Sequence, residues 1–423
     1  MTTLTKIARH RELRKKLLFT AIIFLFYRML AHVPVAGVDL DRLRPILEGS
    51  QFLGLANIFS GGTLANFSVV AIGISPFITA SIIMQLATML FPTLKEIQKD
   101  GEAGREKINQ YTRLLSVPMA VIQSLSVLAL LNSQSLLMDS SPLTVIVMIT
   151  SLIAGAMIVM WLGELITMEG IGNGISMVLL AGIISQVPTT LQQFRFSDVG
   201  QHLTTIGVFA TVFLVVIGLV VFMNEAVRKV DIQYAKRTRG SRTYGGHRSH
   251  LPIRVNVAGV MPIIFAVSIL LAPPFIGRML AGSDREEFWT LGQNLVSWFS
   301  QTSPVYMTVY FVVVFVFTYF SALVFFNTED ISDELKKSGA FIQGIRPGSP
   351  TKKYLDFVVT RITLAGAIFL GVVAILPSMA QLFTGLGSLA IGGTSLLIVV
   401  SVILDTAKQV DSMLVGQSYD QYT

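Results

Sequence analysis

The residues able to carry out chemistry are few in this chain. It has five His and no Cys, which excludes disulfides, thiolate metal sites and thiol nucleophiles. There is no His-Glu-x-x-His motif, no Gly-x-Ser-x-Gly motif and no spaced carboxylate pair within an apolar segment. The GIGNG cluster at 170–174 lacks a following Lys-Ser/Thr and a preceding strand, which favours a tight turn over a phosphate-binding loop. We therefore expect no enzyme activity, no cofactor and no metal.

The composition is that of an all-α membrane protein. Hydrophobic residues make up 52% of the 423 residues, charged residues only 13%, and the mean hydropathy is +0.66. About 17–25 apolar residues are needed to cross the bilayer core as a helix. The sequence predicts ten transmembrane helices, at 17–36, 72–91, 114–131, 143–162, 172–187, 204–223, 256–277, 305–326, 358–378 and 389–407.

The second apolar region is interrupted. Ser60-Gly61-Gly62 precedes a modestly apolar stretch that ends at Ala71, and Gly73-Ile74-Ser75-Pro76 separates it from the run 77–90. Broken helices at membrane depth persist only where they are buried in protein or face a water-filled cavity. We expect a half-helix over 62–71 beside such a cavity, with a re-entrant surface segment as the alternative.

The basic residues predict the orientation. Most of the 32 Lys and Arg lie in segments that the span count places on one side. These segments hold Lys6, Arg9, Arg11, Arg14, Lys15 and Lys16; Lys95, Lys99, Arg105, Lys107 and Arg113; the basic residues of 228–254 and 336–361; and Lys408. By the positive-inside rule this side is the cytoplasm, so both termini of the multi-pass chain are cytoplasmic.

The span count also divides the chain into two parts. Residues 1–193 carry five spans and residues 194–423 carry the other five. Because five is odd, the halves must insert with opposite topology, as in inverted-repeat membrane proteins whose central site lies between the repeats.

Two charged segments, about 224–255 and 327–357, are longer than topology requires. In the first, alternating Val230, Ile232 and Tyr234 followed by a Gly/Arg/Ser cluster predicts a hairpin arm. The second reads as a short polar helix ending near Gly339, followed by a loop carrying Arg346. Charge alone leaves two interpretations open, solvated loops or docking sites.

Motifs in both segments and in the spans carry a resemblance. They are FSGG at 59–62, TASII at 79–83, LKEIQKDGEAGREKINQYTR at 94–113, MWLGELIT at 160–167, GIGNGIS at 170–176, IQYAKR at 232–237, LKKSGAF at 335–341, GIRPG at 344–348 and GGTSLLIVV at 392–400. Their types and order resemble the SecY family of protein-conducting channels, from about Leu17 to Met413. The resemblance implies two halves around an hourglass pore that opens sideways into lipid.

The resemblance also implies a pore seal. The matched pore-ring residues are Ile74, Ile78, Ile175, Leu179, Ile264 and Ile398. A plug at about 60–72 would include Gly62, Thr63, Leu64, Ala65, Asn66, Phe67 and Ser68. A hydrophobic collar excludes water and ions by dewetting.

Other matched residues imply partners. Arg237, Arg239, Arg242 and Arg346 would dock the SecA motor ATPase or the ribosome, since guanidinium groups pair bidentately with ribosomal RNA phosphates. Further implied partners are the small membrane subunits SecE and SecG, signal sequences, translocating polypeptides and the lipid bilayer of the cell inner membrane.

Gln123 and Asn256 are polar residues in or beside spans, where a lipid-facing position is costly. They are candidates for a lateral gate between the second, third and seventh spans, with ordinary interhelical hydrogen bonding as the alternative. Glu164 and Glu169, beside the GIGNG turn, are expected to be solvated loop charges. A secondary transporter also has inverted repeats and broken helices, but the span interiors have almost no ionisable residues for coupling, which favours a passive channel.

Overall fold

The computed structural model describes residues 11–49, 57, 60–134, 136–138, 141–193, 199–234, 237–239, 242–244, 248–257, 259, 261–281, 285–300, 302–384 and 387–420. The first part of the chain forms α2 (Arg11–Leu30), α3 (Leu40–Gly49), α5 (Ser75–Leu90), α6 (Pro92–Lys99), α7 (Glu102–Ser133), α8 (Pro142–Glu169) and α9 (Gly174–Gln193). The second part forms α10 (Val199–Glu225), α11 (Met261–Leu270), α12 (Ala272–Ala281), α13 (Glu286–Trp298), α14 (Pro304–Phe325), α15 (Thr328–Ser338), α16 (Ser349–Thr384) and α17 (Gly387–Asp420). The strands are β1 (Val227–Tyr234), β2 (Arg237–Arg239), β3 (Arg242–Tyr244), β4 (Arg248–Arg254) and β5 (Ala340–Ile342).

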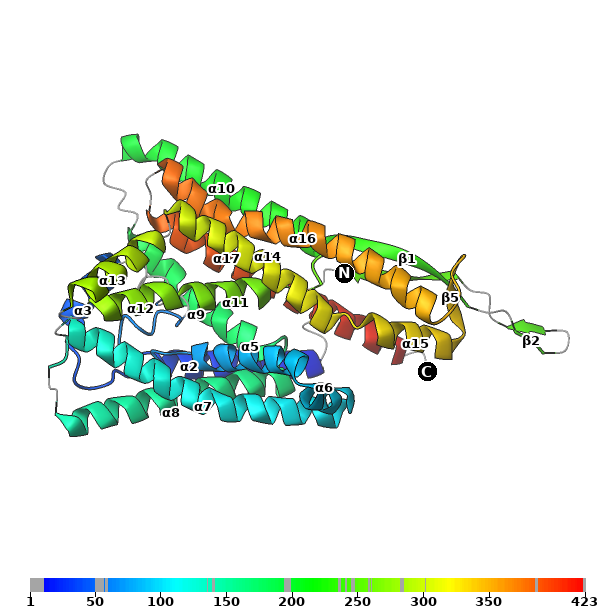
Figure 1. The fold of residues 1–423 in the computed structure, drawn as a ribbon, viewed down its shortest axis with the longest axis horizontal. Helices are drawn as coiled ribbons and strands as arrows, with labels where there is room; N and C mark the ends of the chain where they lie inside the picture. Colours follow the sequence, from blue (N-terminus) through cyan, green and yellow to red (C-terminus); the bar gives the residue numbers. More distant parts are fainter. Residues whose placement is uncertain are drawn as a thin grey trace.

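The long helices run roughly parallel to the long axis of the molecule in two layers (Figure 1). One layer holds α2, α5, α7 and α8, and the other holds α10, α14, α16 and α17. Between them, α9 contacts α17, α11 contacts α5, and α12 contacts α7. The first and second parts of the chain therefore meet along their inner faces.

Five described helices are long and apolar enough to cross a membrane by length and composition. They are Glu102–Asn132, Pro142–Glu169, Met261–Arg278, Pro304–Ala322 and Ser349–Leu382. A sixth candidate is α5 together with α6, which are bent by 101° at their junction. Shorter apolar stretches lie at Gly174–Gln186 and Phe213–Glu225. The ten-span count remains a prediction, because the described helices account for part of it only.

Several helices start and stop where their local sequence dictates. Ser141 and Ser303 accept backbone hydrogen bonds at the starts of α8 and α14, and each is followed by Pro in the first turn. Asn327 caps α15 in the same way. At the other end of α15, Gly339 takes the left-handed conformation with φ 70°, so the predicted short polar helix ending near this glycine is confirmed.

The segment expected to be a half-helix is irregular. Residues 60–74 form consecutive turns, and Ser68 makes an isolated antiparallel bridge to Pro34. Four positions in this segment have positive φ, namely Gly61, Gly62, Gly73 and Phe67. A right-handed helix cannot pass through such residues, so the half-helix prediction over 62–71 is wrong. The Thr63 hydroxyl stabilises the turns by hydrogen bonds to the carbonyls of Ser60 and Val70, at 2.7 and 3.0 Å.

Apart from segment 60–74, the described apolar part of the fold is helical, as predicted, and the strands lie toward one end of it (Figure 1). There β1 and β4 form the predicted antiparallel hairpin, with Val227 opposite Arg254 and Gln233 opposite Arg248. A third strand was not predicted. β5, from the second charged segment, pairs with β1 so that Ile232 faces Ile342. The two loops therefore form one unit, with Val230, Ile253, Ile342, Leu355 and Val359 as its core.

Candidate pore, seam and docking surface

The six pore-ring candidates lie in one apolar cluster. Ile74 immediately precedes α5, Ile78 is in its first turn, and Ile175 and Leu179 are one turn apart in α9. Ile264 and Ile398 come from α11 and α17. Five of the six are buried members of this cluster, from 0% exposure at Ile398 to 6% at Ile78, and Ile175 packs against it partly buried. Segments distant in sequence thus bring six branched aliphatic side chains together.

A second cluster lies next to the first and surrounds the turn segment 60–74. Leu64, Phe67 and Ala71 are buried there, and Phe67 has no exposed surface. They pack with side chains that follow α2 and with side chains of α7 and α8, among them Val35, Val38, Leu128, Leu131, Met148 and Leu152. The plug candidate is therefore a mostly apolar segment that is packed among the helices. Its polar Ser68 is also fully buried.

The turn segment is also bonded through its backbone. Val35 N–H donates to the carbonyl of Phe67, and Val69 N–H donates to the carbonyl of Val33, both at 2.9 Å. At the start of the segment, the Tyr27 hydroxyl donates to the carbonyl of Ser60 at 3.2 Å. These bonds satisfy backbone groups that the turns leave unpaired.

Gln123 joins two helices at the predicted seam. It lies in α7, and its Nε2 donates to Thr79 Oγ1 of α5 at 3.4 Å. Because α5 also contacts α11 and α7 also contacts α12, this bond lies in the helix pair that faces the other layer.

Asn256 does not bond to the second or third span. Its Nδ2 donates to Asn224 Oδ1 of α10 at 2.8 Å, and Asn224 Nδ2 donates to Ser401 Oγ of α17 at 3.2 Å. Lys408 Nζ also donates to the carbonyl of Asn224, at 2.8 Å. Asn256 therefore takes part in ordinary interhelical hydrogen bonding, the alternative that the sequence left open, within a buried network that joins α10 and α17. The reason is that Asn256 precedes α11, next to the end of α10.

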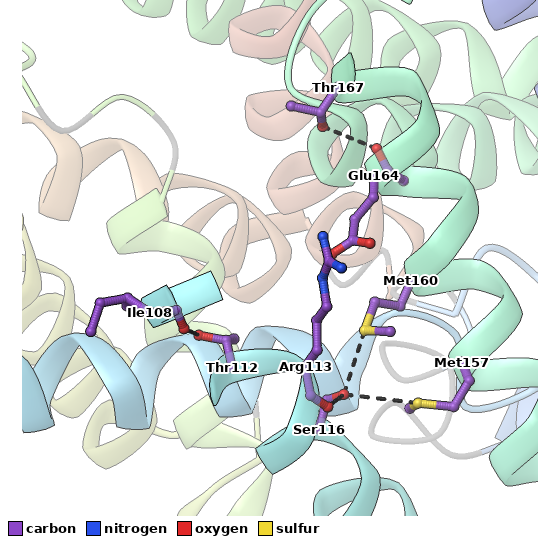
Figure 2. Close-up of polar contacts among 9 residues, drawn as sticks. Ile108, Thr112, Arg113, Ser116, Met157, Met160, Glu164 and Thr167 are labelled. Atoms are coloured by element: carbon purple, nitrogen blue, oxygen red, sulfur yellow. Dashed lines mark hydrogen bonds and ion pairs between the residues drawn. The ribbon is translucent and has the colours of Figure 1, made fainter. Parts of the chain in front are cut away.

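An ion pair that we did not predict joins α7 to α8 (Figure 2). Arg113 Nε lies 2.5 Å from Glu164 Oε1, and the Glu164 side chain is only 15% exposed. Glu164 is a helical residue of α8, so its description as a solvated loop charge is wrong. Figure 2 also shows Ser116, one turn along α7, directed at the sulfur atoms of Met157 and Met160, at 3.9 and 3.5 Å.

A signal for this pair exists in the sequence. The third and fourth spans are consecutive and therefore antiparallel, so the start of one lies beside the end of the other. Arg113 precedes the predicted third span and Glu164 follows the predicted fourth. Opposite charges at these two places predict a contact, which reading each charge alone does not reveal.

The GIGNG cluster has the structural role that was expected. Gly172 has φ +84°, and a Cβ at Gly174 would overlap the carbonyl of Gly163 in α8. Asn173 Oδ1 accepts from the backbone N–H groups of Ile175 and Ser176, at 3.1 and 3.3 Å. The turn therefore positions the start of α9, and with it Ile175.

Arg346 lies exposed in the loop between β5 and α16. Its carbonyl accepts a hydrogen bond from Thr351 Oγ1 at 2.9 Å, and Ser332 Oγ of α15 donates to the carbonyl of Gly348 at 2.9 Å. The loop backbone is thus fixed to both neighbouring helices while the guanidinium remains at the surface. A fixed backbone with an exposed charge suits charge-assisted binding to an anionic partner.

The other three docking candidates lie at the outermost strands. In the β2–β3 hairpin, Arg237 is opposite Tyr244 and Arg239 is opposite Arg242. This hairpin projects furthest from the helices (Figure 1). It is the extension of the β1–β4 hairpin to which β5 and the Arg346 loop are attached, so the four arginines belong to one projecting unit.

Next to this unit, α15 carries acidic residues. Lys352 Nζ of α16 lies 2.9 Å from Glu329 Oε2. This hydrogen bond and charge lower the pKa of the Glu329 carboxyl, and the charges of Lys99 and Lys95 in α6 act in the same direction. The basic residues of α6, in the first part of the chain, thus act on the same carboxyl of α15, in the second part.

Comparison with known proteins gives consistent matches. The SecY family model matches residues 68–407. Protein translocase subunit SecY of Streptomyces galbus is 40% identical over 438 residues, covering 100% of this chain and 99% of the relative. A solved structure described as "The plug domain of the SecY protein stablizes the closed state of the translocation channel and maintains a membrane seal" has a TM-score of 0.66 and 19% identity, covering 97% and 96% of the two chains. Sec61 in the canine ribosome-channel complex from the endoplasmic reticulum has a TM-score of 0.61 and 17% identity, covering 94% and 91%.

Proposed function

Since the chain belongs to the SecY family of protein translocase subunits, we propose that it forms the central pore of the general secretion channel in the cytoplasmic membrane. It passes unfolded polypeptides outward and releases transmembrane segments sideways into lipid. Residues 1–193 and 194–423 act as inverted halves of five spans each around an hourglass pore, with both termini in the cytoplasm. The two helix layers and the one-sided distribution of Lys and Arg support this arrangement.

The observation that carries the proposal is the convergence of Ile74, Ile78, Ile175, Leu179, Ile264 and Ile398 in one cluster. Branched aliphatic side chains from α5, α9, α11 and α17 form a collar that excludes water by dewetting. Such side chains can separate around a polypeptide of any sequence, because they make no directional bonds with it.

Within segment 60–74, residues 60–72 are the plug of this channel. The apolar residues of the plug are packed beside the collar, with Val70 in the collar cluster and Leu64 and Phe67 in the neighbouring one. The SecY structure similar to this chain is described as having a plug domain that maintains a membrane seal. The collar and plug together keep the resting channel closed to ions.

The remaining sites serve entry and exit. The lateral gate is the seam at which α5 and α7 meet α11 and α12. Gln123 lies near this seam, as does the start of α11 that follows Asn256. The unit carrying Arg237, Arg239, Arg242 and Arg346 docks the ribosome, including its RNA, or the SecA motor, which supplies the driving energy. Sec61, a similar channel, is described in a ribosome complex. SecE and SecG are the membrane partners.

Resting ion conductance tests the collar. Replacing Ile74, Ile264 and Ile398 together by Ser should raise the conductance of the purified channel in planar bilayers, because a polar lining removes the dewetting barrier. Deleting residues 62–71 should raise it further by removing the plug. The matched controls are Val312→Ser and Val316→Ser, at positions of α14 that are 49% and 55% exposed on the outside of the bundle. Collar variants as ion-tight as these controls would remove the six residues from the pore.

A further inference from the structure

Segment 60–74 lies on two neighbouring helices where those helices carry glycine. A Cβ added at Gly155 of α8 would overlap the carbonyl oxygen of Val69. A Cβ added at Gly182 of α9 would lie 2.6 Å from the Cα of Gly61, closer than real Cβ atoms approach. The backbone of the segment therefore touches the backbones of α8 and α9 at these two points.

Side chains support the same contacts. Tyr27, which is 3% exposed, donates its hydroxyl hydrogen to the carbonyl of Ser60. Ser185 Oγ, one turn beyond Gly182, donates to the carbonyl of Gly61 at 3.4 Å. The start of the segment is thus held at α2 and α9, and its later part is held at α8.

We propose that Gly155 and Gly182 are positioning residues that seat the plug, with Tyr27 as a hydrogen-bonding support. The inference rests on the proposed function, because it takes residues 60–72 to be the plug. When an added methyl group overpacks a contact, the less rigid of the two contacting segments moves away. Here α8 and α9 are long helices packed among others, whereas the segment is a series of turns. Alanine at either glycine therefore unseats the plug and leaves the six collar side chains unchanged.

The absence of cysteine makes a direct test possible. Ser68 is 0% exposed within the segment, and Ser68→Cys introduces a single thiol of similar size. In proteoliposomes, a water-soluble maleimide should modify this thiol slowly in the otherwise unchanged chain. With Gly155→Ala or Gly182→Ala added, modification should be on the order of tenfold faster, because the seated state is disfavoured. Tyr27→Phe, which removes only the bond to Ser60, should give a rise of roughly two- to tenfold.

Gly207→Ala and Gly218→Ala are matched controls, because a Cβ added at either position of α10 meets no atom within 4 Å. Both should leave the modification rate at the parent value. The proposed role of the two glycines is refuted if Gly155→Ala, Gly182→Ala and Tyr27→Phe also leave the modification rate at the parent value. The same conclusion follows if the controls accelerate modification equally, because the effect would then come from any added methyl group.

Conductance separates this inference from the proposed function. If deletion of 62–71 leaves resting conductance unchanged, the plug assignment itself fails. If the deletion raises conductance while Gly155→Ala changes neither conductance nor Ser68→Cys modification, the plug stands and the seat is wrong. In the deletion background, Gly155→Ala should add no further conductance, since the group it displaces is absent. An additive rise would show that it acts on the helix bundle instead, and would overturn the proposal.

Discussion

The Arg113–Glu164 pair gives a prediction about stability that depends on which partner is removed. The two side chains differ in exposure, at 43% for Arg113 and 15% for Glu164. Arg113→Gln leaves a carboxylate that is mostly buried, whereas Glu164→Gln leaves a guanidinium that still reaches solvent. A charge left unpaired costs more free energy where it is better shielded from water. We therefore expect Arg113→Gln to be the more destabilising variant.

The exposure of the two side chains also determines how much free energy of unfolding each variant should lose. Breaking a fully buried pair costs about 3–5 kcal/mol, and exposed pairs contribute about 0–1 kcal/mol. This half-exposed pair lies between these limits. We expect a loss of about 2–3 kcal/mol for Arg113→Gln and about 1–2 kcal/mol for Glu164→Gln. The double variant should lose about as much as Arg113→Gln alone, which implies a coupling free energy of about 1–2 kcal/mol.

Unfolding in detergent, followed by intrinsic fluorescence for the four members of the cycle, measures these differences. Arg42→Gln is the control, because Arg42 pairs with Asp39 at 3.3 Å but its side chain is 72% exposed. This control should change stability by less than about 0.5 kcal/mol. The reasoning is refuted if Glu164→Gln proves more costly than Arg113→Gln, or if the two losses simply add.

Three further predictions follow from single sites. Arg346→Glu should reduce translocation and motor or ribosome binding without affecting membrane insertion, since Arg346 is exposed in a fixed loop; normal secretion with normal binding would contradict the docking role. Tyr310→Phe should raise stability by about 1 kcal/mol, because this buried hydroxyl has no partner among the described residues, whereas Tyr319→Phe, which loses a 3.3 Å bond to the carbonyl of Thr360, should not. Reporter fusions at Gly348 and Ser283 should report cytoplasm and exterior, respectively, and a cytoplasmic signal at Ser283 would overturn the topology.

The six pore-ring candidates could be named from the sequence because each lies within or close to a motif or a proline at a recognisable span. The motifs GIGNGIS and GGTSLLIVV lead directly to Ile175 and Ile398, and the structure places these two side chains in one cluster although they are far apart in the chain. The hairpin arm was predicted for a different reason. Val230 and Ile232 alternate with a polar residue, as expected of a strand with one buried face. In β1 both side chains are buried, and the residue between them is exposed.

Other features depend on contacts that local patterns do not encode. The apolar residues of 62–71 are compatible with a helix, and the turns arise because Val33 and Val35 offer backbone partners from another segment. β5 has only three residues and becomes a strand by pairing with β1. For Asn256 the sequence left a lateral-gate bond and ordinary interhelical bonding open, and the choice depends on Asn224 of α10, which in turn bonds to Ser401 of α17. In each case the deciding partner is distant in sequence.

The two elements of the proposed seal, the collar and the plug, draw on different parts of the molecule. The apolar cluster around the plug draws all its buried members from residues 35–152, which belong to the first part of the chain. The collar is shared, because Ile74, Ile78, Ile175 and Leu179 come from the first part while Ile264 and Ile398 come from the second. Separating the two layers would therefore divide the proposed collar directly, whereas the contacts of Leu64, Phe67 and Ala71 within their cluster would remain. A second, independent displacement is needed to unseat the plug, and the glycine contacts at α8 and α9 are where the structure resists it.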